Sequence, residues 1–494
     1  PDWADSQNVF FELPAEQNQA DYLSFMSNKT ADVVERFVQQ LREHASSDRD
    51  IWVPYGHSFE RLATREGHCA LSRLMEGDID GFISPVSYSD RGIGGTGGFM
   101  GPLDSARNHD KLWLILDDTR TGLAEETRVE EDLVADLGMD DVYSVLWRNF
   151  AGAATHRAGL IWTDPRGEGA FNDAGIWGQF GRMDQSYREV FEPTGEEDGG
   201  VAYSSRMFTP GVTVVIDEES RFFQRCEDPL NTFLLKNVRD TVLQAGVTAN
   251  FCLLEDLLEE RCQPSPAYLF VNIFKLNPSD RSAVHDLLAR QQAAAIWLYA
   301  PGYMSTDDAG ILTGNAENVS ATVGMTVHAF EEPAQSGSKW TSQGIWIEEG
   351  GEFGPSVTWC TLFYVADDVS STCAIYAASE KPSVAVKFLE EGWTSVYVAE
   401  PYISVELLRE LFHTVGCPFH LWEAPKKAVA TMHFGYGIIG IHAQTPGDRV
   451  FDLGEHMNLT DLVSPKVGWL NKDRLTLPLS AGETRVLKAN PVEA

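Results

Sequence analysis

The feature of this sequence that most constrains its fold is a repeated alternation of short apolar segments with segments of helical periodicity. Residues 30–44 carry apolar side chains at helical spacing behind Thr30, which can act as an N-cap. Strands that are separated by helices pair in parallel through right-handed crossovers. The alternation therefore predicts a parallel α/β structure. The predicted strands lie in the apolar segments 50–56, 80–88, 111–121 and 159–165.

Each of these four strands ends in polar or aromatic residues. In a (β/α)8 barrel, the C-terminal ends of the strands are where sites are built. Four polar ends that converge are harder to explain by packing than any one of them alone. The residues at these ends are Tyr55, His57, Tyr88, Asp90, Arg91, Asp117, Asp118, Arg120, Trp162 and Asp164.

Asp117 and Asp118 are adjacent, so on an extended strand they point to opposite faces and only one can face the mouth of a barrel. Asp118 could act as a nucleophile or as a hydrogen-bond acceptor for a substrate, with Arg120 holding it ionised. An Asp–Arg pair at a strand end can equally tie down a loop. The pair alone leaves both interpretations open.

Residues 89–99 form a glycine-rich segment that is not a phosphate-binding loop, because it lacks the GK[ST] ending and does not lead directly into a helix. We predict a mobile loop over the barrel mouth rather than a plain surface loop.

Three regions and a linker divide the chain. We assign residues 1–191 to a partial barrel, 192–204 to an acidic glycine-rich linker, 205–426 to an open parallel α/β sheet domain and 427–494 to a small antiparallel β-sandwich. The middle region resembles an amidotransferase sheet, and its strands include the segments 393–400 and 418–423. Its segment 299–305 has no nucleophile where an amidotransferase would need one, so a structural role is favoured there.

The charge and the polar inventory exclude several classes of function. The formal net charge of −35 argues against nucleic-acid binding and against anionic membranes, and no apolar run is long enough to span a bilayer. The twelve histidines form no ligand cluster, so we predict no metal and no cofactor. Of the seven cysteines, Cys252 with Cys262 and Cys360 with Cys373 are near enough in sequence to pair. Three glycosylation sequons weakly favour an extracellular location; they lie at Asn28, Asn318 and Asn458.

The segment 77–121 resembles the later barrel strands of family 42-type β-galactosidases. The resemblance continues through residues 159–165 and 212–220, and it extends to the segments 294–303, 391–416 and 440–454. It implies the order barrel, amidotransferase-like trimerisation domain and β-sandwich. It further implies a retaining glycosidase plan, in which one carboxylic acid protonates the leaving oxygen and a carboxylate attacks the anomeric carbon.

Against that family pattern, two departures matter. Counting back from 159–165 as the eighth strand makes these strands five to eight, so the family's acid/base lies outside the chain. The nucleophile position at the end of the seventh strand is Leu116, and a leucine cannot attack an anomeric carbon. Half a barrel would expose strand edges, so we expect the other half from an N-terminal segment or a partner chain. The resemblance also implies a homo-oligomer, a trimer formed through the middle domain.

Two hypotheses for the function follow. The first is a β-galactosidase-like glycoside hydrolase, with Asp118, Asp117 and Arg120 as catalytic residues. The second is a non-catalytic structural or carbohydrate-binding relative, which Leu116 favours. Stacking faces and hydrogen-bond donors serve either function. The expected substrate-binding residues are Tyr55, His57, Tyr88, Arg91, Trp162 and Asp164.

Overall fold

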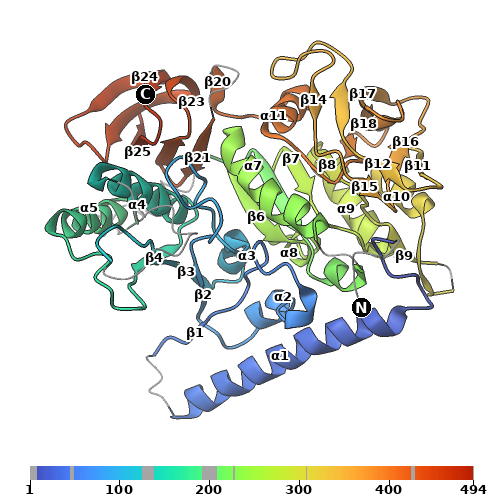
Figure 1. Ribbon diagram of the computed structural model, residues 1–494, viewed down its shortest axis with the longest axis horizontal. Coiled ribbons are helices and arrows are strands. Elements are labelled where there is room, and N and C mark those ends of the chain that lie inside the picture. Colours follow the sequence, from blue (N-terminus) through green and yellow to red (C-terminus); the bar gives the residue numbers. More distant parts are fainter. Residues whose placement is uncertain are drawn as a thin grey trace.

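The computed structural model describes residues 8–44, 49–124, 138–191, 208–225, 228–307, 309–423 and 429–492. The predicted linker at residues 192–204 lies outside these described residues. Figure 1 shows three regions, with the first sheet and its helices on one side, a large mixed sheet on the other, and a β-rich region above the first.

The first region contains a four-stranded parallel sheet with the strand order β1-β2-β3-β4, which confirms the predicted pairing. Among the described residues, three of the helices below lie in the crossovers between successive strands, and the fourth follows the last strand. The strands are β1 (Trp52–Val53), β2 (Gly81–Pro85), β3 (Leu112–Asp117) and β4 (Gly159–Trp162). The helices are α2 (Leu71–Met75), α3 (Leu103–Asn108), α4 (Met139–Ala154) and α5 (Ala174–Phe191).

The two faces of this sheet differ, because successive side chains along a strand point in opposite directions. In β3, Trp113 and Ile115 are buried against the helices, whereas Leu112 is 55% exposed. Leu116 lies on the same face as Leu112, between its register partners Pro85 and Ile161. This second face, which we call the open face, is apolar and half-exposed.

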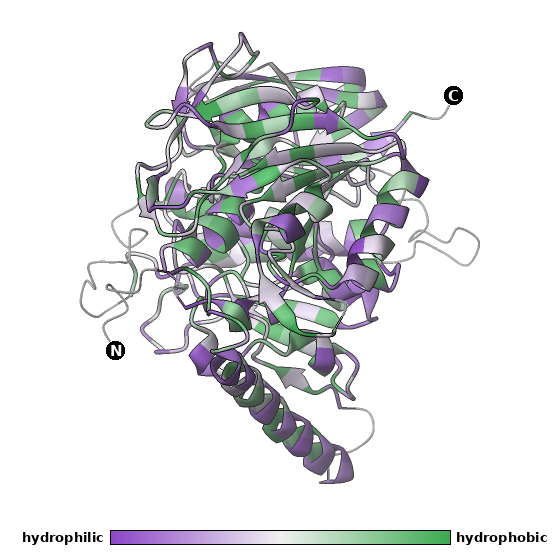
Figure 2. Cartoon of the chain, turned by 90° about the vertical axis from the view of Figure 1, so that its right-hand side faces the viewer, coloured by the Kyte–Doolittle hydropathy of each residue, from purple (hydrophilic) through white to green (hydrophobic). Residues whose placement is uncertain are grey.

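A long helix, α1 (Gln17–His44), precedes the sheet. The predicted start at Thr30 is wrong, because the Thr30 hydroxyl donates to the Met26 carbonyl inside the helix and does not cap it. One side of α1 packs on η2 (Thr64–Glu66) and η3 (Glu219–Phe223). Figure 2 shows α1 at the lower edge of the molecule, where apolar residues remain on its outer side. These exposed residues are Tyr22, Phe25, Val33, Phe37 and Leu41.

The middle region is built on a nine-stranded sheet with the order β14-β13-β17-β18-β19-β8-β7-β5-β6. The strands from β19 to β6 pair in parallel, but β18, β17, β13 and β14 pair antiparallel, so the predicted all-parallel sheet is corrected to a mixed one. The antiparallel strands come from the stretch that has little periodicity in the sequence. The strands are β5 (Val212–Ile216), β6 (Ala249–Leu253), β7 (Ala267–Phe270), β8 (Ala294–Leu298), β13 (Ser338–Trp340), β14 (Glu352–Phe353), β17 (Ser371–Tyr376), β18 (Pro382–Phe388) and β19 (Thr394–Val398).

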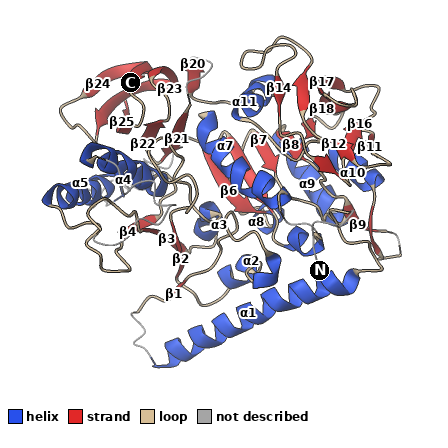
Figure 3. Cartoon of the chain, in the orientation of Figure 1, coloured by secondary structure: helices blue, strands red, loops and turns tan. Residues whose placement is uncertain are grey.

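Helices flank this sheet, as Figure 3 shows. The helix α7 ends at Gly246, whose φ of +84° is left-handed, so the predicted glycine cap is confirmed. The helical elements are η4 (Thr232–Asn237), α7 (Val238–Ala245), α8 (Leu254–Leu258), α9 (Pro278–Gln291), α10 (Ala316–Val323) and α11 (Val405–Thr414). Short strand pairs lie beside the sheet: β9 (Met304–Thr306), β10 (Leu312–Gly314), β11 (Val327–Ala329), β12 (Ala334–Gln335), β15 (Thr358–Trp359) and β16 (Phe363–Val365).

The C-terminal region forms one six-stranded antiparallel sheet, rather than the two hydrogen-bonded sheets of the predicted sandwich. Residues 418–423 do not join the middle sheet as predicted, because β20 pairs with β23 instead. One side of the new sheet packs on α4 through β22 and β25. Its strands are β20 (Leu421–Glu423), β21 (Ala430–Gly435), β22 (Ile438–Ala443), β23 (Gly447–Asp461), β24 (Gly468–Leu479) and β25 (Thr484–Pro491).

Within the described ranges, no helix has both the length and the apolar character needed to cross a membrane. The two cysteine pairs that the sequence left open are not bonded, since free thiols include Cys252, Cys262, Cys360 and Cys373.

Candidate functional site

The site is built around Asp118, which directly follows β3. Its Oδ1 accepts a hydrogen bond from Nη2 of Arg91 at 2.9 Å, and its Oδ2 accepts one from the Tyr88 hydroxyl at 3.0 Å. The Asp118 side chain is 15% exposed and that of Arg91 is 7% exposed, so the ion pair is largely shielded from water. Charge-assisted bonds of this kind are short and fix the orientation of a carboxylate. The structure therefore brings together three of the predicted site residues.

Tyr88 is the accessible part of this cluster, with 59% of the residue exposed. The Arg91 guanidinium lies 4.6 Å from the centre of the Tyr88 ring, a cation–π contact that orients the ring. Burial of the hydroxyl, and then the neighbouring Asp118 charge, raise the pKa of Tyr88 to about 12. The phenol therefore stays protonated and donates to Asp118 at neutral pH.

Asp117 lies on the other face of β3, as the strand geometry predicts. It is fully buried, with Oδ1 accepting from the Thr119 backbone N–H at 3.1 Å and Oδ2 accepting from the Asn149 amide at 3.0 Å. Burial raises the pKa of Asp117 above its ordinary value. These contacts tie the end of β3 to α4 and give Asp117 no path to a substrate at the open face.

Arg120, which the sequence paired with Asp118, forms a 2.7 Å ion pair with Glu168 in the loop after β4. The arginine that the structure places on Asp118 is Arg91. The sequence predicted Arg91 as a substrate-binding residue, and its link to Asp118 depends on the turn that follows β2.

The other predicted site residues have partners elsewhere. Trp162 stacks on Phe180 of α5 with ring centres 4.0 Å apart, on the helix-covered face of the sheet. Asp164 accepts the backbone N–H of Gly169 at 2.7 Å and so closes a turn. In the described part of the chain, Trp162 and Asp164 form no hydrogen bond or ring contact with Asp118.

Tyr55 and His57 follow β1. Tyr55 is buried, and its hydroxyl accepts the Ala70 backbone N–H at 3.1 Å beside the start of α2. His57 is half-buried with Nε2 3.4 Å from the Ile83 carbonyl, and burial lowers its pKa. Both residues therefore support the loops around β1 and β2, at a distance in the hydrogen-bond network from Asp118.

The glycine-rich segment 89–99 is mostly buried, so the prediction of a mobile loop over the mouth is corrected. Arg148 of α4, itself 1% exposed, donates to the carbonyl oxygens of Arg91, Gly92 and Gly95 at 2.8, 2.7 and 3.0 Å. On the opposite side, the Gly94 backbone N–H donates to Nε2 of His442 in β22 at 2.7 Å. The segment is a junction between the first and C-terminal regions.

Sequence reasoning missed Arg148 and Asn149, which support the site from α4. A signal existed for Asn149, because it follows Val142 by seven residues and Leu146 by three and so falls on the buried stripe of the helix. A buried polar residue on such a stripe needs a partner. In the ranges that the structure covers, no group of three or more His, Cys, Asp and Glu side chains could hold a metal ion.

Comparisons with known proteins place the fold. No protein-family model and no curated protein matches the chain. Three solved structures match over nearly its whole length: GH42 β-galactosidase of G. stearothermophilus (10% identity, TM-score 0.61), cold-adapted β-galactosidase of Rahnella sp. R3 (11%, 0.61) and β-galactosidase of the haloarchaeon Halorubrum lacusprofundi (12%, 0.60). The matches cover 96%, 96% and 95% of this chain, and 68% of each of those chains.

These matches define the class of the fold, which is glycoside hydrolase-like. Within that class, the fold is that of GH42 β-galactosidases, so the resemblance drawn from the sequence is confirmed at the level of the fold. At 10–12% identity the likeness establishes the fold alone.

Proposed function

We propose that this chain binds a carbohydrate at the C-terminal ends of β2 and β3, without hydrolysing it. The observation that supports the proposal best is the group formed by Tyr88, Arg91 and Asp118: an exposed aromatic ring fixed beside a shielded carboxylate. Such a ring can stack on the apolar face of a sugar, while the carboxylate and the guanidinium bond its hydroxyl groups.

The presence of a leucine at position 116 favours binding without turnover. A retaining glycosidase needs two carboxyl groups about 5–5.5 Å apart, one of which attacks the anomeric carbon. Where the family resemblance expects that nucleophile, Leu116 lies between Pro85 and Ile161 on the apolar open face. A hydrocarbon side chain can neither attack the sugar nor stabilise positive charge on it.

A second candidate, hydrolysis with Asp118 as nucleophile, is favoured by one specific contact. The 2.9 Å bond from Arg91 places a positive charge beside the carboxylate and orients it, as a nucleophile requires. Asp118 shares the face of Leu116, but its side chain is shorter than that of a glutamate and both of its oxygens already accept hydrogen bonds.

One experiment separates the two candidates. Lactose binding is measured by calorimetry and release of nitrophenol from an aryl β-galactoside is followed in the same protein. We expect binding that Tyr88→Ala weakens by tenfold or more, and no release above that of Asp118→Asn. Release that Asp118→Asn abolishes would establish hydrolysis instead. Absence of binding to lactose and to a panel of β-linked glycans would contradict the proposal.

We also propose that further parallel α/β strands cover the open face, because β1 and β4 leave their outer edges unpaired within the described sheet and Leu112 and Ile161 are exposed there. The partner that fits is the complementary half of a barrel. Sedimentation of residues 1–494 alone, with a hydrophobic dye, tests this: we expect dye binding or self-association. A monomer that binds no dye would contradict it.

A further inference from the structure

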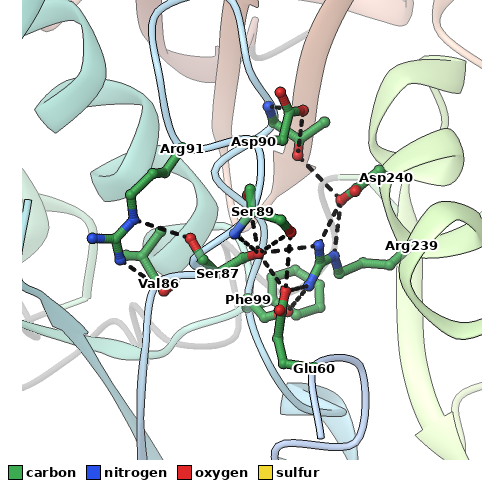
Figure 4. A network of polar contacts seen from close by, with 10 residues as sticks. Glu60, Val86, Ser87, Ser89, Asp90, Arg91, Phe99, Arg239 and Asp240 are labelled. Atoms are coloured by element: carbon green, nitrogen blue, oxygen red, sulfur yellow. Dashed lines mark hydrogen bonds and ion pairs between the residues drawn. The ribbon is translucent and has the colours of Figure 1, made fainter. Parts of the chain in front are cut away.

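Arg239, in helix α7 of the middle region, points into the first region. Its side chain is completely buried, and Nη1 donates to Oε1 of Glu60 and to the carbonyl oxygen of Phe99, both at 2.9 Å. Asp240, the next residue of α7, pairs with the same guanidinium at 2.8 Å. Two carboxylates thus compensate the buried charge, which is what a buried guanidinium requires. The segment that follows β2 comprises residues 86–99, and Figure 4 shows the guanidinium pointing at it.

Ser87 connects this ion pair to the candidate site. Its hydroxyl donates a hydrogen bond to the Glu60 carboxylate and accepts one from Nη2 of Arg239 at 3.3 Å. Ser87 directly precedes Tyr88, and its carbonyl oxygen accepts Nε of Arg91 at 3.2 Å. The same short segment therefore contacts Arg239 on one side and carries the aromatic ring of the site on the other.

A second contact holds the far end of the segment. Oδ1 of Asp240 accepts the Thr96 hydroxyl at 3.1 Å, and Thr96 also donates its backbone N–H to Asp90 at 2.9 Å. Close to this point, a Cβ atom on Gly98 would lie 2.6 Å from Nε of Arg239. Glycine at position 98 therefore allows the guanidinium to approach the backbone. The segment is held at both ends by two consecutive residues of α7.

A buried guanidinium needs acceptors for its N–H groups, and those of Arg239 lie in three separate parts of the first region. Here Arg239 contacts Glu60 after β1, Ser87 at the start of the segment and Phe99 at its end. With Glu60 and Ser87 in place, the segment has little freedom to rotate Tyr88 away from Asp118. These hydrogen bonds therefore couple the position of α7 to the positions of Tyr88 and Arg91.

We infer that Arg239 is a positioning residue for the candidate site: through Glu60 and Ser87 it sets Tyr88 and Arg91 against Asp118. If the site binds a carbohydrate, as proposed above, the middle region contributes to the affinity without touching the sugar. This consequence rests on the proposed function. The positioning itself is measurable in the absence of any ligand.

The test compares Ser87→Ala and Arg239→Lys with a matched control, Arg409→Lys. Arg409 is a buried arginine of α11 that donates to the backbone carbonyl oxygens of Gln244 and Ala245, at the opposite end of α7 from Arg239. Ionisation of Tyr88 is isolated as the difference in tyrosinate absorbance between each protein and the same protein carrying Tyr88→Phe. Ser87→Ala keeps the inference testable should Arg239→Lys not fold.

We expect the pKa of Tyr88 to fall from about 12 toward its ordinary value of 10 in Ser87→Ala and Arg239→Lys, because a released ring is better hydrated and farther from Asp118. Arg409→Lys should lower the unfolding temperature and leave the titration of Tyr88 unchanged. Lactose affinity should fall roughly tenfold in the first two variants only. An unchanged titration of Tyr88 in both would overturn the inference. A shifted titration in a protein that binds no glycan would support it and contradict the proposed function alone.

Discussion

The two parallel sheets of this protein use the same strand pairing but have different environments. In β5 and β8 of the middle sheet every residue is buried, so both faces are covered. In β3 of the first sheet burial alternates, and Leu112 at its start is 55% exposed. A parallel sheet covered on both faces buries its apolar side chains completely, whereas the first sheet leaves the apolar side chains of one face partly exposed.

Acids at the strand ends show the same contrast. Asp217 and Glu218 follow β5, whereas Asp117 is the last residue of β3 and Asp118 follows it. Asp217 and Glu218 are both buried, as Asp117 is. Oε2 of Glu218 accepts the Leu71 backbone N–H at 2.6 Å, so the middle sheet caps α2 of the first region. Burial raises the pKa of Asp217 to about 6 and that of Glu218 to about 7. A position at a strand end therefore does not by itself give an acid access to solvent: of these four acids, Asp118 is 15% exposed and the other three are buried.

The largest expected effect tests the difference in burial. Trp297 of β8 is fully buried and stacks on Phe270 with ring centres 4.0 Å apart. Trp297→Ala should lower the free energy of unfolding by about 3–5 kcal/mol. Leu112→Ala on the open face should cost less than about 1 kcal/mol, since little apolar surface is lost. Denaturant unfolding measures both, and equal costs would remove the distinction between the sheets.

A smaller effect concerns pH. The folded pKa of Glu218, about 7, lies above the ordinary glutamate value of 4.5, so the folded state binds the proton more tightly than the unfolded state. Its contribution to stability is therefore complete below about pH 4.5 and is lost as the pH rises through about 7, a change of order 3 kcal/mol. Unfolding free energies of wild type and Glu218→Gln, measured between pH 5 and 8, give this contribution as their difference. A difference that does not vary with pH would show that Glu218 titrates normally.

The smallest effect sharpens the account of the site. Tyr88→Phe removes the hydroxyl that donates to Asp118 and leaves the ring on Arg91. Because Tyr88 is 59% exposed, the free energy of unfolding should change by less than about 1 kcal/mol. Thermal unfolding checks this value. A loss of several kcal/mol would mean that Tyr88 supports the fold and is not a surface for a ligand.

Periodicity in the sequence was enough to predict the four parallel strands, the cap at Gly246 and the opposite directions of Asp117 and Asp118, because these depend on neighbours along the chain. It was not enough for β20, which pairs with β23 and not with the middle sheet. It also placed the start of α1 at Thr30 rather than Gln17, since Thr30 can cap a helix or bond back within one.

By itself, the sequence determined the four parallel strands of the first region, the polar residues at their ends and the position of Leu116 where the family resemblance expects a nucleophile. Only the tertiary structure decided that Arg91 pairs with Asp118 and that Trp162 stacks on α5. It also decided that Arg239 donates to Ser87, the residue before Tyr88. The physical reason is that Arg239 and Ser87 are 152 residues apart, and contacts across such separations depend on how whole regions pack. No local pattern of charge or hydropathy records that packing.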